Sequence, residues 1–259
     1  MGLPLSTSAH RAGVPLLAAI CHDLRAPLAS VTMGANFVLQ SAQRDEANGR
    51  SVKILEAMLR SCTQMERLIR NFADLSEIES NGVVLRLGPH DAGEILALTA
   101  ESFRELGLSH SVTLEVIPPA QPITVRCDRE RIARALGHIV ENALHYAPAS
   151  SKVMLSVKLH DGTVSFAVVD RGPGLSPEQK EHLYDRRWHA QRASRPGAGL
   201  GLAVAHGFVE AHEGRLEVKS RPGEPTTFTL VIPKDGPQPE SGRRAVGLVG
   251  DPVQLELLS

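Results

Sequence analysis

Two glycine-rich segments hold residue types that suit phosphate binding. DRGPG (residues 170–174) directly follows an apolar run typical of a strand, and GAGLGL (residues 197–202) directly precedes one typical of a helix. Glycine lets a ligand approach the backbone closely, and a helix N-terminus offers unpaired N–H groups to phosphate. Neither segment has the spacing of a P-loop or of a dinucleotide-binding turn. Each cluster alone is more typical of an ordinary turn, so an inference of chemistry depends on their combination with other residues.

The stretch AICHDLRAPLAS (residues 19–30) places His22, an acid and a proline in what otherwise has the pattern of a helix. Apolar residues recur every seven positions and predict a helix with a heptad seam: Leu17, Leu24, Val31 and Val38. His22 follows Leu17 by five residues, which is the heptad position farthest from the seam, so we expect its imidazole to face solvent. Helix packing therefore does not explain this histidine. A surface histidine without a role is the alternative that the pattern leaves open.

A second long helix is predicted after the polar break SAQRDEANGR. Its apolar seam includes Met58, Met65 and Phe72, again seven residues apart. The two helices predict a hairpin, and each apolar stripe is wider than one partner helix can cover. The sequence therefore predicts a four-helix bundle made from two chains, which is a homodimer. Glycine and proline in ESNGVVLRLGPHD mark a domain boundary near residues 80 to 90.

From about residue 90 the pattern changes to mixed helices and strands, which predicts an α/β sandwich with helices on one face of a mixed sheet. Helices are predicted over residues 91–106, 128–146 and 200–213, and strands at SVTLEVI, KVMLSVKL, TVSFAVVD, RLEVKS and TFTLVI. An Asp-Gly turn at Asp161 and Gly162 joins two of these strands as a hairpin. Ser176 and Gln179 predict the capping box of a further short helix.

The composition is that of a globular protein without a bias toward nucleic acid. The 259 residues include 28 basic and 29 acidic side chains, with a formal charge of -1, so there is no basic excess to attract nucleic acid. The apolar stretch at residues 14–21 is too short for a membrane span and lacks a signal-peptide cleavage pattern, so we expect a cytoplasmic protein. Three cysteines at spacings that match no zinc motif predict reduced thiols and no disulfide.

Five segments occur in the order found in one family of signalling enzymes. They are AICHDLRAPLAS, HIVENALHYA, VVDRGPGLS, HLYDRRW and GAGLGLAVAHGFVEAHEG. Over residues 14–233 they resemble the H, N, G1, F and G2 boxes of sensor histidine kinases of two-component systems. The resemblance implies a dimerisation and phosphoacceptor hairpin (HisKA), followed by an ATP-binding domain (HATPase_c) of the type shared by gyrase, MutL and chaperone ATPases. It also implies ATP and Mg²⁺ as cofactors.

The resemblance makes His22 the nucleophile that meets the γ-phosphate of ATP. A neutral imidazole is a competent nucleophile at neutral pH. Asp23 is then positioned in sequence to accept a proton from one ring nitrogen while the other attacks. Arg25 is a candidate phosphate partner, with a solvated surface arginine as the alternative. Pro27 removes a helix hydrogen bond, which indicates either a hinge or a tolerated kink.

In the second domain the resemblance implies contacts with the nucleotide. Asn142 corresponds to the asparagine whose side-chain oxygen binds Mg²⁺, an ion that requires oxygen ligands. Asp170 corresponds to the aspartate that accepts a hydrogen bond from the adenine amino group. Tyr146 corresponds to the aromatic that lines the pocket, with ordinary core packing as the alternative. The other candidates are His145 and residues of the glycine clusters, which flank a lid and approach the phosphates: Gly172, Gly174, Gly197, Gly199, Leu200 and Gly201.

Three positions depart from the family pattern. His138 stands four residues before Asn142, where the kinases usually carry asparagine and the related ATPases and serine kinases carry a glutamate base. An imidazole is a poorer partner for Mg²⁺ than an amide oxygen. His145 stands where lysine or arginine is frequent, and a neutral histidine would hold phosphate less firmly. Ala26 stands four residues after His22, where threonine or asparagine orients a water, so we expect little phosphatase activity.

These features predict an ATP-dependent protein-histidine kinase that phosphorylates His22 and passes the phosphoryl group to an aspartate in the receiver domain of a response regulator. The alternatives are a degenerate nucleotide-binding scaffold of the same fold, motivated by His138 and His145, and an ATPase or serine kinase of the same superfamily.

The predicted domain organisation has four parts. They are an N-terminal extension, a dimerisation and phosphotransfer hairpin, a catalytic ATP-binding domain, and a linker with a C-terminal extension, over residues 1–13, 14–80, 88–234 and 235–259. Because so few residues precede the first helix, we expect either a fragment of a longer kinase or a chain that receives its signal from a separate sensor protein. The last residues, AVGLVGDPVQLELLS, resemble the start of a receiver domain, with a plain extension as the alternative.

Overall fold

The structure is a computed structural model of the 259-residue chain and describes residues 24–25, 27–38, 40, 49–80, 83–184 and 200–238. The described residues up to Ser76, together with Leu200, belong to one compact unit. Glu77–Tyr184 and residues 201–238 belong to a second unit. Six positions singled out in the sequence lie outside the described residues: Leu17, His22, Asp23, Ala26, Gly197 and Gly199. The predicted N-terminal extension and the C-terminal segment AVGLVGDPVQLELLS also lie outside them.

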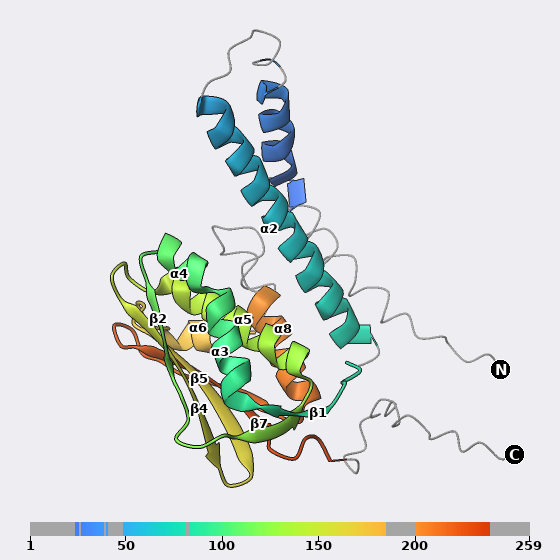
Figure 1. The fold of residues 1–259 in the computed structure, drawn as a ribbon, viewed down its shortest axis with the longest axis vertical. Coiled ribbons are helices and arrows are strands. Elements are labelled where there is room, and N and C mark those ends of the chain that lie inside the picture. The colour runs from blue at the N-terminus through green and yellow to red at the C-terminus, as the bar shows by residue number, and fades with distance from the viewer. Residues whose placement is uncertain are drawn as a thin grey trace, which may run out of the picture. The chain divides into compact units, whose positions relative to one another are not determined.

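The first unit is built from two packed helices, one through residues 27–38 and the other α2 (Gly49–Ser80) (Figure 1). Gly34 lies against Met58 and Ile54 of α2. A Cβ atom at Gly34 would lie 2.6 Å from Met58 Cγ, so the glycine permits the close approach of the helices at this point. Met58 belongs to the seam that the seven-residue repeat predicted, and the predicted helical hairpin is confirmed.

The second unit contains a five-stranded mixed sheet in the order β2-β4-β5-β7-β6 (Figure 1). Its strands are β2 (Thr113–Ile117), β4 (Lys152–His160), β5 (Thr163–Asp170), β6 (Arg215–Lys219) and β7 (Thr226–Pro233). β2 and β4 run parallel, and the other neighbouring pairs are antiparallel. A separate two-stranded sheet pairs β1 (Gly88–Asp91) with β3 (Thr124–Cys127).

Three helices, α3 (Ala92–Ser102), α5 (Arg129–Tyr146) and α8 (Leu200–Ala211), cover one face of the five-stranded sheet (Figure 1). The core between them is apolar, with fully buried side chains from both layers. These include Phe166, Phe228 and Leu155 from the strands and Ile139, Leu136 and Phe208 from the helices. Burial of side chains of this size is the main stabilising term of such a fold. The predicted α/β sandwich is confirmed.

Local sequence signals explain several element ends. Asp161 and Gly162 have φ angles of 44° and 73° in the turn between β4 and β5, as the Asp-Gly signal predicted. At α6 (Pro177–Glu181) both halves of the predicted capping box form between Ser176 and Gln179. Asp128 caps α5, because its side chain accepts a hydrogen bond from the Arg131 N–H at 3.1 Å.

Two features differ from the sequence prediction. The single helix expected over residues 91–106 is broken at Phe103 into α3 and α4 (Arg104–Ser109). The Phe103 ring packs on α5 at Gly137, where a Cβ would lie 3.2 Å from Phe103 Cε2, so tertiary packing accompanies the break. The pairing of β1 with β3 was not predicted, because GPHD carries a glycine and a proline, which are rare in strands.

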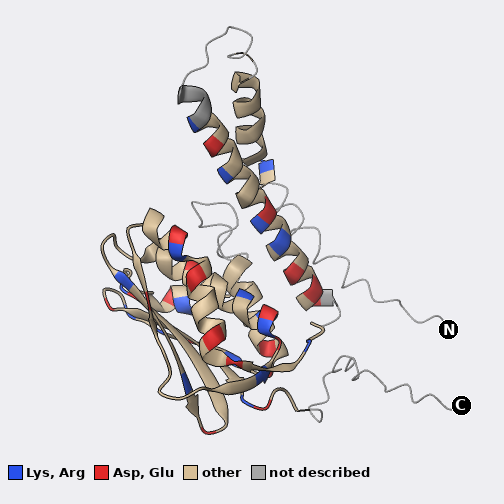
Figure 2. Ribbon diagram, viewed as in Figure 1, with Lys and Arg blue, Asp and Glu red and all other residues tan. Residues whose placement is uncertain are grey.

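Charged side chains of both signs are interspersed over the described elements (Figure 2). Several form exposed ion pairs, such as Arg60 with Glu56 on α2 and Lys152 with Glu115 across β4 and β2. Exposed pairs of this kind contribute little to stability, and their mixture of signs agrees with a formal charge of -1. None of the helices within the described residues has the length and apolarity needed to cross a membrane.

Candidate functional site

A buried carboxylate closes the end of β5. The Asp170 side chain is 4% exposed, and its Oδ1 accepts a hydrogen bond from the Gly172 N–H at 2.7 Å. Burial raises the pKa of Asp170, and the Gly172 hydrogen bond opposes part of that rise. One carboxylate oxygen is thus held by the turn that follows the strand, which fixes the orientation of the group.

Gly172 brings the C-terminus of α5 against this carboxylate. A Cβ at Gly172 would lie 2.8 Å from Asp170 Oδ1, 3.1 Å from the Tyr146 carbonyl oxygen and 3.3 Å from Tyr146 Cβ. Only glycine leaves that space open. Asp170, Gly172 and Tyr146 were three separate sequence candidates, and the fold brings all three together.

Rings from α5 and a neighbouring turn gather beside Tyr146. The Tyr146 side chain is 54% exposed, so the core-packing alternative does not hold for it. The His145 ring contacts the Tyr146 ring edge-on, with 4.9 Å between centroids, and the His110 ring lies 6.2 Å from that of His145. The three rings therefore lie near one another at the C-terminal end of α5, where the Tyr146 ring is exposed.

One face of α5 approaches the first turn of α8. Asn142 and His138 are four residues apart on α5, so they lie on the same face one turn from each other. A Cβ at Gly201 would lie 3.0 Å from His138 Nδ1 and 3.3 Å from His138 Cγ. Leu200, which precedes it and begins α8, is 9% exposed. The structure therefore places His138 at the N-terminal end of α8, where backbone N–H groups can receive an anion.

The DRGPG turn is held by a second glycine. Gly174 has a φ of 74°, and a Cβ there would overlap the carbonyl oxygen of Arg221 in the turn between β6 and β7. The Gly223 N–H donates to the Pro173 carbonyl at 2.8 Å and joins the same two turns. Gly174 is consequently a position where both the backbone conformation and the space require glycine.

Two hydroxyl residues that sequence reasoning missed support the same turn. Ser220 Oγ accepts a hydrogen bond from the Leu175 N–H at 2.9 Å and lies 2.8 Å from Thr226 Oγ1. Thr226 is 5% exposed and pairs with Asp170 in the register of β5 and β7. The only signals in the sequence were their positions, because Ser220 ends the predicted strand RLEVKS and Thr226 directly precedes the predicted strand TFTLVI.

Tyr184 fixes the chain after α6. Its hydroxyl donates to the Leu216 carbonyl of β6 at 2.9 Å, and its ring packs on the His206 ring of α8 with 4.3 Å between centroids. Burial raises the pKa of Tyr184 to about 12, so its hydroxyl stays a donor at every physiological pH.

A buried histidine joins α8 to the start of α5. His212 is 1% exposed; its Nδ1 lies 2.7 Å from the Phe208 carbonyl, and its Nε2 accepts from the Asp128 N–H at 3.0 Å. Because Nε2 accepts, Nδ1 carries the proton and donates to Phe208. Burial lowers the pKa of His212, partly offset by the Phe208 hydrogen bond and the Asp128 charge. Sequence reasoning did not single out this residue.

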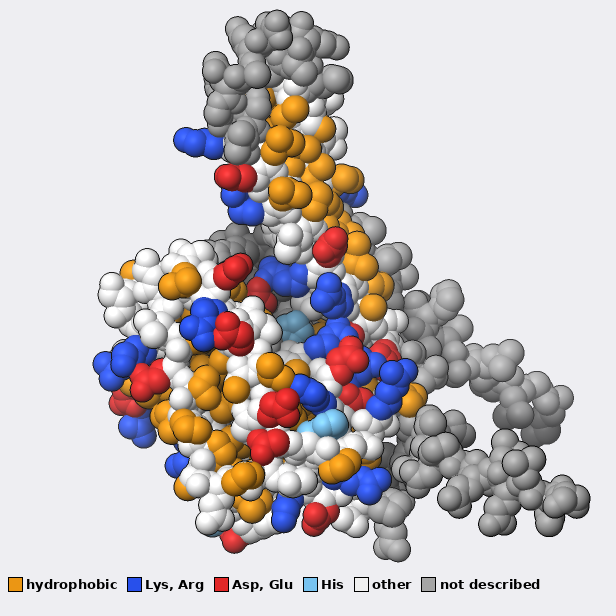
Figure 3. All heavy atoms as spheres, in the orientation of Figure 1, with side chains coloured by type: hydrophobic (Ala, Val, Ile, Leu, Met, Phe, Trp, Pro, Cys, Tyr) orange, Lys and Arg blue, Asp and Glu red, His pale blue; other side chains and the backbone are white. Residues whose placement is uncertain are grey.

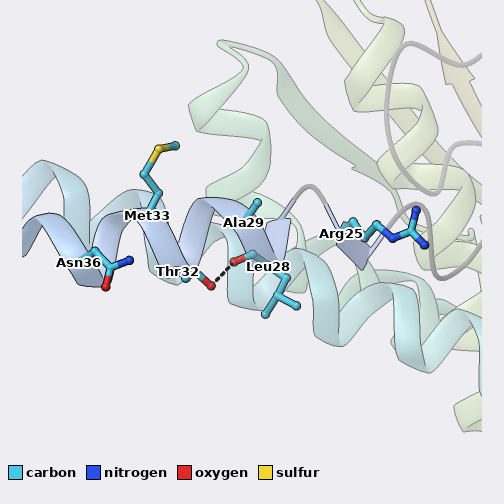
Figure 4. A pocket seen from close by; sticks show the side chains of 6 residues that line it. All are labelled: Arg25, Leu28, Ala29, Thr32, Met33 and Asn36. Atoms are coloured by element: carbon cyan, nitrogen blue, oxygen red, sulfur yellow. Dashed lines mark hydrogen bonds between the residues drawn. The ribbon is translucent and has the colours of Figure 1, made fainter.

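On the first helix, Arg25 is exposed and lies at one end of a shallow groove (Figure 4). The groove runs along one helix face, and the side chains that line it are Arg25, Leu28, Ala29, Thr32, Met33 and Asn36. Within it, Thr32 Oγ1 donates to the Leu28 carbonyl at 2.9 Å. The surface is therefore mainly apolar, with one cation at the end nearest in sequence to His22.

Two family models match the sequence. "His Kinase A (phospho-acceptor) domain" matches residues 16–81, and "Histidine kinase-, DNA gyrase B-, and HSP90-like ATPase" matches residues 127–236. The second match contains Asn142, Asp170 and both glycine clusters. The two matches together therefore cover the helical segment with His22 and the domain with the glycine clusters.

Curated relatives share the sequence at moderate identity. Histidine protein kinase DivJ of Caulobacter vibrioides is 29% identical over 220 residues, which are 84% of this chain and 36% of the relative. Signal transduction histidine-protein kinase BaeS of Escherichia coli is 30% identical over 221 residues, which are 84% of this chain and 46% of the relative. The chain therefore spans less than half of the length of either relative.

Solved structures share the fold. Full-length ShkA in complex with AMPPNP matches with a TM-score of 0.64 at 21% identity, over 86% of this chain and 46% of that one. Histidine kinase ThkA in complex with the response regulator protein TrrA matches with a TM-score of 0.65 at 19% identity, over 88% of this chain and 64% of that one. With a phosphoacceptor region, an ATPase-type domain and histidine kinases among its relatives, the chain belongs to the sensor histidine kinase family.

Proposed function

We propose that this chain is an ATP-dependent protein-histidine kinase that phosphorylates its own His22 and passes the phosphoryl group to an aspartate of a response regulator. The observation that carries the proposal is the corner formed by Asp170, Gly172 and Tyr146, a fixed buried carboxylate beside an exposed aromatic ring at the open end of α5. This arrangement suits a purine with an exocyclic amino group, because one carboxylate oxygen is already satisfied by Gly172 and the other is left to accept from a ligand.

The phosphate groups would extend toward the start of α8. The first turn of α8, with Gly201, would offer backbone N–H groups to the phosphates, and Asn142 would offer an amide oxygen to a divalent cation. Bound Mg²⁺ would neutralise charge on the triphosphate. His145 would face the same region from the last turn of α5 as a neutral or cationic donor.

In the reaction, an unprotonated ring nitrogen of His22 attacks the γ-phosphorus, the bond from phosphorus to the bridging oxygen breaks, and ADP leaves. Asp23 accepts the proton from the other ring nitrogen. The phosphoryl group then moves from nitrogen to a regulator carboxylate. Arg25, which is exposed and follows His22 by three residues, is a candidate to hold the charged group during transfer.

The active assembly that we propose is a homodimer through the helical hairpin. Apolar side chains remain exposed along both helices, and Figure 3 shows hydrophobic side chains gathered along the hairpin. Leu28, Leu55, Leu59 and Ile69 are 55%, 44%, 67% and 57% exposed. A second hairpin would cover such a surface and complete a four-helix bundle. The proposed domain limits stay those of the sequence, with the hairpin over residues 14–80 and the catalytic domain over residues 88–234.

The first test is incubation of the full chain and of its His22→Ala variant with γ-labelled ATP and Mg²⁺ or Mn²⁺. Label that is acid-labile, alkali-stable and absent from the variant supports the kinase. Binding of nucleotide without label in any condition would favour a scaffold instead, which His138 and His145 motivate. Rapid loss of phosphate from a regulator in the presence of this protein and ADP would contradict the low phosphatase activity that we propose from Ala26.

A further inference from the structure

The cation end of the proposed nucleotide site has an unusual donor set. Asn142 supplies an amide oxygen, and one turn earlier on the same face of α5 stands His138. Side chains four residues apart on a helix have Cβ atoms about 5–6 Å from each other, which is close enough for both to bind one ion.

The structure also fixes where the His138 ring lies. The ring packs against Gly201 in the first turn of α8, where a side chain as small as alanine would lie 3.0 Å from Nδ1 and 3.5 Å from Cβ of His138. The absent Cβ at Gly201 makes the room that the imidazole occupies. His138 is half-buried, so the ring has little freedom to leave this position for bulk solvent.

The chemistry of the two donors differs. Mg²⁺ is a hard ion that takes oxygen ligands in a strict octahedron and gives up water reluctantly. Imidazole nitrogen binds first-row transition ions better than it binds Mg²⁺, and oxygen ligands such as carbonyl and phosphate suit Mn²⁺ as well as Mg²⁺. A site with one amide oxygen, phosphate oxygens and one imidazole nitrogen therefore matches Mn²⁺ more closely than Mg²⁺.

We propose that His138 is a metal ligand of the nucleotide site and that it shifts the preference of the site from Mg²⁺ toward Mn²⁺ and similar first-row ions. The inference rests on the proposed function, because it concerns the cation that accompanies the nucleotide. It adds a specificity-determining residue that the family pattern does not contain, since the corresponding position usually carries asparagine.

Binding of ADP to the full chain, measured by calorimetry in Mg²⁺ and in Mn²⁺, tests the preference. We expect ADP to bind the wild-type protein about tenfold more tightly with Mn²⁺ than with Mg²⁺, and we expect His138→Asn to reduce that ratio to about threefold or less. The matched control is His160→Asn. His160 is an exposed histidine at the end of β4, and its replacement should leave the ratio unchanged.

A spectroscopic readout tests ligation first in the wild-type chain and then in His138→Asn. Electron spin echo modulation of Mn²⁺ bound with ADP reports nitrogen nuclei that are directly attached to the ion. We expect nitrogen modulation that changes between protein made with ordinary histidine and protein made with ¹⁵N-labelled histidine, and that disappears in His138→Asn.

The outcomes separate the inference from the proposed function. ADP binding with no histidine-dependent modulation, or with an unchanged Mn²⁺ to Mg²⁺ ratio in His138→Asn, would overturn the role of His138 and leave the kinase standing. Failure of ADP to bind the wild-type protein with either ion would overturn both. The isotope comparison uses the wild-type chain. A result without nitrogen modulation there would overturn the inference even if His138→Asn folds poorly.

Discussion

Replacement of Asp170 by asparagine should separate nucleotide recognition from the stability of the fold. Asn is close to Asp in size and can keep the local hydrogen bond, with its side-chain oxygen accepting from the Gly172 N–H as Asp170 Oδ1 does at 2.7 Å. The amide nitrogen then stands where the second carboxylate oxygen stood. In the proposed complex that oxygen accepts a hydrogen bond from the adenine amino group. In the variant, the new side-chain amide N–H would face the adenine N–H, and two donors cannot form a hydrogen bond.

The expected loss of affinity follows from the bond that is removed. A hydrogen bond to a charged group contributes about 1.5–3 kcal/mol. At roughly 1.4 kcal/mol for each factor of ten, ADP should bind Asp170→Asn about 10- to 150-fold more weakly than it binds the wild-type protein. Inosine diphosphate carries an acceptor in place of the amino group, so the variant should bind it better relative to ADP than the wild-type protein does.

The effect on stability should have the opposite sign. Burial raises the pKa of Asp170 above its unfolded value, so the folded chain binds this proton more tightly than the unfolded chain. The stabilising contribution of the protonated group is then greatest below the unfolded pKa of about 3.9, and it is lost as pH rises through the raised folded pKa. At pH 7 the ionised, 4% exposed carboxylate carries a desolvation cost that an amide lacks. We therefore expect a higher Tm for the variant at pH 7, and a difference that shrinks as pH falls toward 4.

Calorimetric titration with ADP and with inosine diphosphate, together with thermal unfolding between pH 4 and pH 8, measures both effects. Asp161→Asn is the matched control, because Asp161 is an exposed carboxylate in the β4–β5 turn and should change neither quantity. ADP affinity within about twofold of the wild-type value, with no rise in Tm, would refute the role given to Asp170.

Three further variants probe the supports of the site. His212→Leu should lower the free energy of unfolding by about 2–5 kcal/mol at pH 7.5, because the Asp128 N–H loses its buried partner. Since burial lowers the pKa of His212 in the folded chain, the wild-type protein loses stability as the pH falls below about 6.5. Urea unfolding at pH 5.5 should therefore show a smaller difference between the variant and the wild-type protein. Gly174→Ala should cost at least about 2 kcal/mol in urea unfolding, since φ is 74° and the methyl group meets a backbone carbonyl, and unchanged stability would contradict that geometry. Tyr184→Phe should cost about 1 kcal/mol by losing its bond to Leu216, and an unchanged Tm would mean that the bond is dispensable.

The parts of the fold that the sequence predicted are those set by neighbouring residues. The Asp161 turn, the Ser176 capping box and the helix that ends at Tyr146 all depend on signals within a few positions. The break at Phe103 and the β1–β3 pair depend on partners far along the chain, such as Gly137 on α5. Propensity and periodicity contain no information about such partners, which is why these features were missed.

The same distinction holds within the candidate site. Asp170 and Gly172 were found because they share one motif, and the fold then places Tyr146 beside them. Ser220 and Thr226 were missed because they reach the site only through the register of β5 with β7 and through the turn that follows β6. A side chain that supports a turn from another strand has no fixed spacing from the residues it supports.

The two ends of the proposed nucleotide site differ in how they are built, and this decides where variation can change function. At the base end, Asp170 is held by a backbone hydrogen bond, and Gly172 and Gly174 in its turn leave no room for a Cβ. A substitution at either glycine therefore disturbs the fold together with the recognition, whereas a change of Asp170 itself acts mainly on recognition. At the phosphate end, His138 and His145 are half-buried and lie seven residues apart on one face of α5. A side chain on this face can change without moving a strand of the sheet. Substitutions at the phosphate end can therefore retune the cation and the charge while nucleotide binding persists, which is the pattern of departures that this chain shows.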